Sequence, residues 1–168
     1  MSLYFKYLKI HFKIELQYKI SFILSFLSQF FVFFGYYFTI ICLFQKFSNL
    51  KGFTVYEVLL SFGIIQFGCS FCETFFRGVD QFDNLIIDGS FDRLLLRPRN
   101  IILQIFGEEI SFTRFSRLLQ SIIVLIIAVI KINIKWNLYK VLTLFFMLIS
   151  SISIFLGLFI LAASYCFI

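Results

Sequence analysis

Long apolar stretches alternate with polar segments along the sequence. The first stretch, residues 20–44, carries no charged side chain. At about 1.5 Å of rise per residue it is long enough to cross a hydrocarbon core of about 30 Å. It is too long for the apolar core of a cleaved signal peptide, so we expect it to stay in the mature protein. The same reasoning predicts four membrane-spanning helices, at about residues 20–44, 54–76, 118–133 and 141–168.

Residues 2–19, before the first span, have the pattern of an amphipathic helix. Apolar side chains recur at helical spacing, and lysines share a different face of the same helix. The apolar positions are Phe5, Leu8, Phe12 and Leu16, and the lysines are Lys6, Lys9 and Lys13. Such a helix lies in the membrane interface, with its apolar face in the acyl boundary and its lysines near anionic head groups. The alternative is a cytoplasmic extension of the first span.

The composition excludes an ordinary soluble domain. Hydrophobic residues make up 61% of the chain and charged residues only 14%, whereas soluble domains average roughly 45–50% and about 25%. The net charge of +6 does not indicate nucleic-acid binding, because the basic residues flank the apolar stretches and form no single patch. We therefore predict an all-α fold, a single polytopic transmembrane helical bundle that lies in the lipid bilayer and binds no nucleic acid.

The segment 77–117 is the most polar part of the chain and must lie outside the lipid. It holds six arginines and six of the nine acidic residues. With four spans, this segment and the N-terminal helix share one side and carry ten basic residues, against five in the opposite turns. Because basic flanks stay in the cytoplasm, we predict a multi-pass protein of a bacterial inner membrane, with a cytoplasmic N-terminus and a cytoplasmic loop at 77–117.

Two acidic residues, Glu57 and Glu73, interrupt the second apolar stretch. Both lie near its ends, where a carboxylate can stay hydrated, whereas one at the bilayer centre costs about 2.5–3.5 kcal/mol. They are either helix-end residues or part of a transport pathway or subunit interface. Cys69 and Cys72 form a C-x-x-C, but zinc needs four ligands and the single histidine, His11, is far away in sequence. We interpret the two cysteines as small side chains on one helix face.

Residues 75–98 predict an elbow of two short amphipathic helices. Acidic and apolar residues fall on different faces of the first helix, and Gly89 suits the left-handed conformation that ends it. Ser90 is expected to cap the second helix, and Asp92 lies in its first turn, where a negative charge is favourable. Pro98 disfavours further helix. A rigid elbow with charged tips and an apolar underside suits the docking of a partner protein.

The elbow carries a recognisable run, Gly89-Ser90-Phe91-Asp92-Arg93-Leu94-Leu95-Leu96-Arg97-Pro98, preceded by Arg77-Gly78 and residues 80–83. This run resembles the signature loop of ABC-2 family permeases, and residues 117–120 and 155–159 extend the resemblance. The resemblance implies the membrane subunit of a type-2 ABC exporter, which pairs with a second permease subunit, as a homodimer or heterodimer, and with cytoplasmic ATPase subunits. Family members typically carry six spans, so we expect this sequence to be an N-terminal fragment.

In that family the loop between spans two and three contacts the ATPase. The resemblance therefore makes eight residues candidates for a coupling site: Asp80, Asp83, Asp88, Gly89, Asp92, Arg93, Arg97 and Pro98. It also implies no catalytic residue and no cofactor on this chain, with ATP and Mg²⁺ on the partner ATPase. Independently, the sequence contains no G-x-x-x-x-G-K-[ST] phosphate loop. The other interpretation of the charges is an ordinary solvated loop face.

Two other functions stay open. One is a membrane enzyme in which Asp80, Asp83, Asp88 and Asp92 hold Mg²⁺ for phosphoryl-group transfer, although the Asp88-Gly89 pair lacks the continuation that such enzymes need. The other is a channel or a non-transporting assembly subunit. Phe-rich spans offer little to coordinate an ion, which favours a large amphiphilic cargo for a transporter. No residue identifies the substrate.

Overall fold

The structure is a computed structural model that describes residues 2–46, 52–98, 100–132 and 137–166. In this part of the chain the regular structure is helical, and no strand is present. The helices are α1 (Ser2–Gln17), α2 (Lys19–Lys46), α3 (Val55–Phe75), α4 (Arg77–Asp80), α5 (Phe82–Ile87), α6 (Ser90–Leu95), α7 (Ile101–Glu108), the 3-10 helix η1 (Phe112–Arg114), α8 (Phe115–Lys131) and α9 (Leu138–Tyr165). The predicted all-α class is confirmed.

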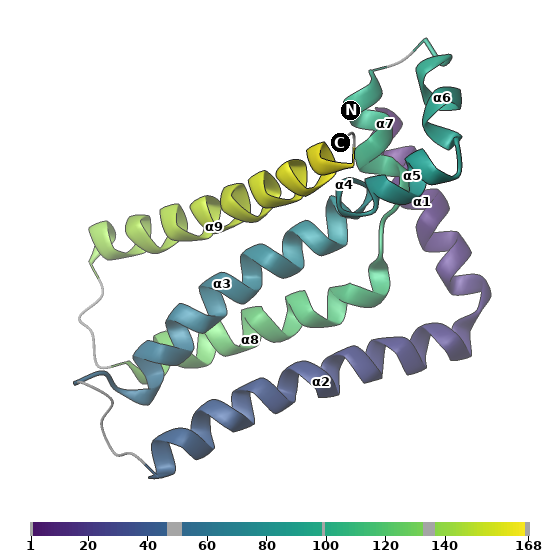
Figure 1. The fold of residues 1–168 in the computed structure, drawn as a ribbon. Coiled ribbons are helices and arrows are strands. Elements are labelled where there is room, and N and C mark those ends of the chain that lie inside the picture. The colour runs from purple at the N-terminus through teal and green to yellow at the C-terminus, as the bar shows by residue number, and fades with distance from the viewer. Residues whose placement is uncertain (1, 47–51, 99, 133–136, 167–168) are drawn as a thin grey trace.

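The four long helices run side by side, and the short helices gather at one end of this bundle (Figure 1). Helix α3 is central, because it packs against both α8 and α9, whereas α2 packs mainly against α8. Among the described residues, four helices are long and apolar enough to cross a membrane: Lys19–Lys46, Val55–Phe75, Phe112–Lys131 and Leu138–Tyr165. The predicted membrane bundle is therefore confirmed in its architecture.

Apolar side chains cover the outside of the bundle as well as its core. On α9, Phe146 is 75% exposed, and on α8, Ile130 is 73% exposed. A small buried cluster of Tyr37, Leu59 and Ala128 joins α2, α3 and α8 inside. Soluble proteins rarely expose a continuous apolar surface of this extent. Lipid is the solvent in which these outer faces are stable.

Small residues allow α9 to lie very close to α3. The Ser151 hydroxyl donates to the carbonyl of Ile64 at 3.1 Å, across the two helices. Gly68 faces the same serine, and a Cβ at position 68 would lie 2.8 Å from the Ser151 carbonyl carbon. Such contacts between small residues are a common basis of helix association in membranes. Cys72 is buried here, and its thiol donates to the carbonyl of Ile152 at 3.4 Å.

The third and fourth spans begin earlier than predicted. Helix α8 begins at Phe115 and α9 at Leu138, each three residues before the predicted start, and η1 directly precedes α8. The polar segment also contains a helix that the sequence reasoning missed, α7, whose Gln104 and Gly107 are buried. Residues 133–136, where the third predicted span ends and the predicted turn begins, lie outside the described residues.

Gly68→Ala is expected to destabilise the bundle, because the added methyl group overlaps Ser151. Overpacking of this kind costs about 1–3 kcal/mol. Thermal unfolding of the purified chain in detergent, followed by circular dichroism, measures the change. Gly157→Ala is the matched control on α9, because nothing lies within 4 Å of a Cβ there. If both variants melt together with the unsubstituted chain, the close contact between α3 and α9 is refuted.

Candidate functional site

The elbow follows α3 directly and consists of α4, α5 and α6. The chain bends at Phe76, where φ is −121° and ψ is 26°, and again at Gln81. Because of the second bend there are three short helices and not the predicted two. Gly78 lies against α7, where a Cβ would collide with the carbonyl oxygen of Ile105. The close approach of these two backbones holds the start of the elbow on α7.

The turn between α5 and α6 is built on Gly89. Its φ of +63° lies in the left-handed region, as predicted, and nothing lies within 4 Å of a Cβ there. The predicted role of Ser90 as the cap of α6 is wrong, because Gly89 occupies the N-cap position and Ser90 is the first helical residue. The left-handed turn starts the helix one residue early. The Ser90 hydroxyl instead donates to the carbonyl of Leu85 at 3.2 Å.

The elbow buries an apolar underside. The rings of Phe82 and Phe91 meet edge to face, with centroids 5.2 Å apart. Phe82 is 5% exposed and Leu94 is 2% exposed. These side chains fix α5 and α6 to each other, as the amphipathic pattern predicts. The polar face of the elbow is thereby left toward the outside.

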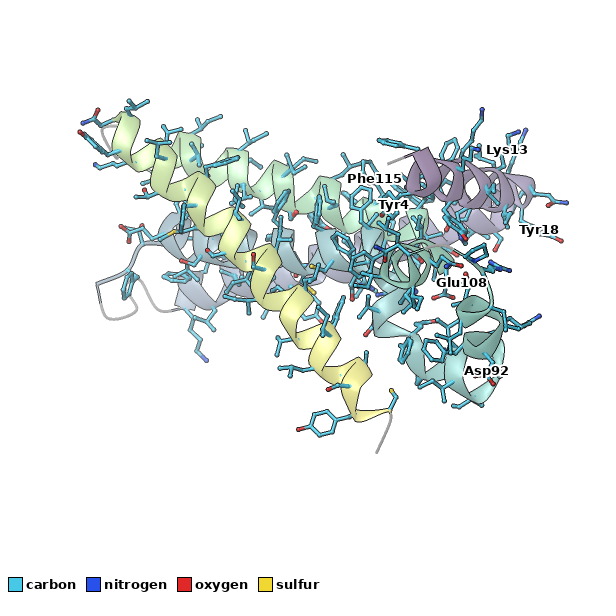
Figure 2. All side chains as sticks on the ribbon, turned by 90° about the horizontal axis from the view of Figure 1, so that it is seen from above. Tyr4, Lys13, Tyr18, Asp92, Glu108 and Phe115 are labelled. Atoms are coloured by element: carbon cyan, nitrogen blue, oxygen red, sulfur yellow. The ribbon has the colours of Figure 1, made fainter. Side chains whose placement is uncertain are left out.

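The charged candidates lie on that outer face. Figure 2 places Asp92 at the outer tip of the elbow, away from the long helices. The exposed candidates are Asp80, Asp83, Asp88, Gly89, Asp92, Arg93, Arg97 and Pro98. Within the described residues, none of the six charged ones takes part in an ion pair. Their charges are therefore available to a partner.

An ion cluster lies beneath the elbow, where α3 ends. The two oxygens of the Glu73 carboxylate each contact an arginine, Oε1 with Nη1 of Arg114 at 2.8 Å and Oε2 with Nη1 of Arg117 at 2.6 Å. Arg117 also donates through Nε to Oε1 of Gln29 at 2.7 Å. The cluster thus connects α2, α3, η1 and α8 at one level of the bundle.

Sequence reasoning left Glu73 as either a helix-end residue or part of a pathway or interface, and it did not find the partners of this residue. Arg114 and Arg117 were assigned to the polar loop, although they lie three residues apart at the start of an apolar stretch. Two cations with this spacing fall on one face of a helix. An acid at the end of a neighbouring span is the signal that pairs them. Because the ion pairs reduce the cost of charge near the lipid boundary, α8 can begin with a turn that carries an arginine.

Glu57 lies at the other end of α3. Its Oε2 accepts a hydrogen bond from the backbone N–H of Thr54 at 2.8 Å, which satisfies a free donor at the start of the helix. The structure therefore separates the two acidic residues by the length of α3. Glu57 has the position of a capping residue, and Glu73 lies in the ion cluster.

A further ion pair, outside the ion cluster, ties the elbow to the segment after α7. Nε of Arg77 lies 3.4 Å from Oε2 of Glu109. When the Gln81 amide is turned so that its nitrogen faces Glu109, it donates to Oε2 at 2.7 Å and its oxygen accepts from Arg77. The first elbow helix is therefore fixed at both of its ends. Helices α4 and α7 are therefore held against each other.

Helix α1 packs across the same end of the bundle. The Tyr4 hydroxyl donates to the carbonyl of Phe75 at 2.8 Å, and burial raises the pKa of Tyr4 to about 12, so the donor stays protonated. The Tyr7 ring lies against Gly107. Oε1 of Glu15 accepts from the N–H of Phe112 at 3.0 Å. Helix α1 therefore contacts the end of α3, α7 and η1.

The part of the chain that the structure describes contains no group of three His, Cys, Asp or Glu side chains placed to hold a metal ion. The elbow aspartates are spread over three short helices and the turn after α5. This end of the bundle is thus a charged outer face on an apolar underside, joined by ion pairs to membrane helices.

Residues 30–168 match the sequence model of a family described as ABC-2 family transporter protein. The chain belongs to this family. The match covers the elbow, the three charged residues of the ion cluster and all four long helices except the start of α2, so the family resemblance is confirmed. The chain is accordingly a multi-pass membrane protein and a permease subunit of an ABC transporter, the transport component of such a system. Neither a curated protein nor a solved structure matches it.

Glu73→Gln is expected to destabilise the permease by about 3 kcal/mol, near the low end for breaking a buried ion pair. The low end applies because the three side chains keep between 15% and 21% exposure. Thermal unfolding in detergent measures the loss. Glu57→Gln is the matched control, because a glutamine oxygen can still accept from Thr54. Equal melting temperatures for the two variants would show that the ion cluster does not stabilise the permease.

Glu15→Gln is expected to stabilise the permease increasingly as the pH rises. Burial raises the pKa of Glu15, so the folded chain favours the neutral carboxyl and binds more protons than the unfolded chain. The contribution of Glu15 to stability is therefore greatest below its ordinary pKa and declines as the pH rises through the raised value. Gln keeps an acceptor for Phe112 and removes the titration. Unfolding of both proteins across acidic to neutral pH tests this, and parallel curves would contradict it.

Proposed function

We propose that the elbow formed by α4, α5 and α6 docks a cytoplasmic ATPase subunit and passes its movement to the membrane helices, so that the permease exports a substrate. The observation that carries the proposal is the pairing of an exposed charged face with a buried underside. Asp92, Arg93 and Arg97 are exposed, whereas Leu94, between them in sequence, is 2% exposed. Short helices anchored in this way move as one body.

The path of the movement follows the contacts at the end of the bundle. Helix α4 is held to α7 at Gly78 and to Glu109 through Arg77. It continues from α3, whose last turn carries Glu73 and its two arginines. A push on the elbow therefore reaches α3 and α8 together. To drive transport, ATPase binding must favour one arrangement of these helices over another.

The remaining parts of the system lie on partners. ATP and Mg²⁺ would be bound by the ATPase, and a second permease subunit, identical or different, would complete the pathway. The outward apolar faces of α2 and α9 offer surface to that subunit and to lipid. Basic residues concentrate in α1 and the 77–117 segment, which supports a cytoplasmic N-terminus and elbow in a bacterial inner membrane.

The double variant Asp92→Asn with Arg97→Gln is expected to lower transport-coupled ATP hydrolysis about tenfold, as a loss of about 1.4 kcal/mol in docking does. The assay uses the permease reconstituted with its ATPase. The matched control is Glu57→Gln with Lys46→Gln, which also removes one acid and one base, but at the far end of the bundle. Full coupling in the elbow variant would refute the assignment.

Cysteine labelling tests on which side of the membrane the elbow lies, which the coupling experiment assumes. In a cysteine-free background, a cysteine at position 92 is treated with a membrane-impermeant maleimide in intact cells. Protection of this cysteine until the membrane is opened supports a cytoplasmic elbow. Reaction at the outer surface would rule out ATPase docking on the elbow, whatever the hydrolysis rates.

A further inference from the structure

Helix α1 carries a stripe of three exposed lysines. Lys6, Lys9 and Lys13 recur at spacings of three and four residues, so they fall on one face of the helix. Figure 2 shows Lys13 pointing outward, away from the other helices. Among the described residues, none of these lysines is in an ion pair. We call Lys6, Lys9 and Lys13 the lysine face.

The opposite side of α1 is held by the protein. Tyr4, Tyr7 and Glu15 make the contacts to Phe75, Gly107 and Phe112 described above. At 100° per residue these three side chains centre on the side of the helix turned away from the lysines. The contacts fix the rotation of α1 about its axis. The lysine face is consequently oriented outward by packing.

The position of α1 places this face at the level of lipid head groups. Helix α1 ends at Gln17, and the first span begins at Lys19. Figure 1 shows α1 running across the end of the bundle and not along the spans. Exposed apolar side chains flank the lysines on both sides, with Phe5 67% exposed and Ile14 52% exposed. A helix with this arrangement lies in the interface plane.

We propose that the lysine face binds anionic phospholipid head groups, with the flanking Phe5 and Ile14 side chains in the acyl boundary. Phospholipid offers both halves of the surface its complement, because phosphate meets the ammonium groups and acyl chains meet the apolar flanks. An acidic soluble protein would pair with the lysines but leave the flanks exposed. The surface is separate from the elbow and does not depend on ATPase docking.

The test is amide hydrogen exchange of α1 in the full chain, in nanodiscs of phosphatidylcholine and of an equimolar mixture with phosphatidylglycerol. Phosphatidylglycerol is expected to slow exchange in α1 by about fivefold or more, the effect of one lysine near an anionic surface. High salt is expected to reverse the slowing, because it screens exposed charges. The absence of any slowing in the unsubstituted chain overturns the proposal.

Variants assign the effect to the lysine face. Lys6→Gln, Lys9→Gln and Lys13→Gln together are expected to abolish the slowing while leaving exchange in phosphatidylcholine unchanged, which shows that α1 still folds. The control replaces Lys46, Lys131 and Lys140, three exposed lysines at the other end of the bundle, by Gln and is expected to keep it. Equal slowing in both variants refutes the site. If inorganic phosphate slows amide exchange of α1 in phosphatidylcholine discs, lipid is refuted as the occupant. The same holds if exchange slows only when the ATPase is added.

Discussion

The carboxylate of Glu73 holds together the end of the bundle at which α3 meets η1 and α8. A single acid there would have to stay hydrated, and two arginines on the neighbouring span would each carry their own desolvation cost. Paired at 2.6 and 2.8 Å, the three groups offset part of one another's desolvation cost. The last turn of α3 and the first turn of α8 are therefore held in a fixed position relative to each other. The elbow, η1 and α1 are all positioned from those two turns.

The ion cluster also explains why the polar segment 77–117 is a compact structure. Between α3 and α8 the described chain makes four short α-helices and the 3-10 helix η1, and each packs on a neighbouring helix. Gly78 lies on α7, Phe82 packs on Phe91, and Tyr7 of α1 packs on Gly107. These contacts are small individually. They stabilise the loop because both of its ends are fixed by the ion pairs.

The number of spans could be predicted from the sequence, because a long apolar stretch is unstable in water and has few structures open to it other than a membrane-spanning helix. The turn at Gly89 follows for the same kind of reason, since few residues other than glycine adopt a positive φ easily. The partners of Glu73 do not follow, because they lie 41 and 44 residues away and depend on how α3 and α8 pack. Helix α7 was missed because its apolar residues are diluted by the charged ones around them. The bend at Gln81 has no local signal, and it arises where α4 packs on α7.

Gly89 sets the direction of α6 in the elbow but does not contribute to the stability of the bundle. The turn is held by one backbone conformation, and the space around it is open. Because φ of Gly89 is +63°, most other residues there would be strained, and the added Cβ would meet no atom of α3, α8 or the ion cluster. Under the proposed function, related permeases that differ at this position would therefore present the charges of α6 to their ATPases at another angle.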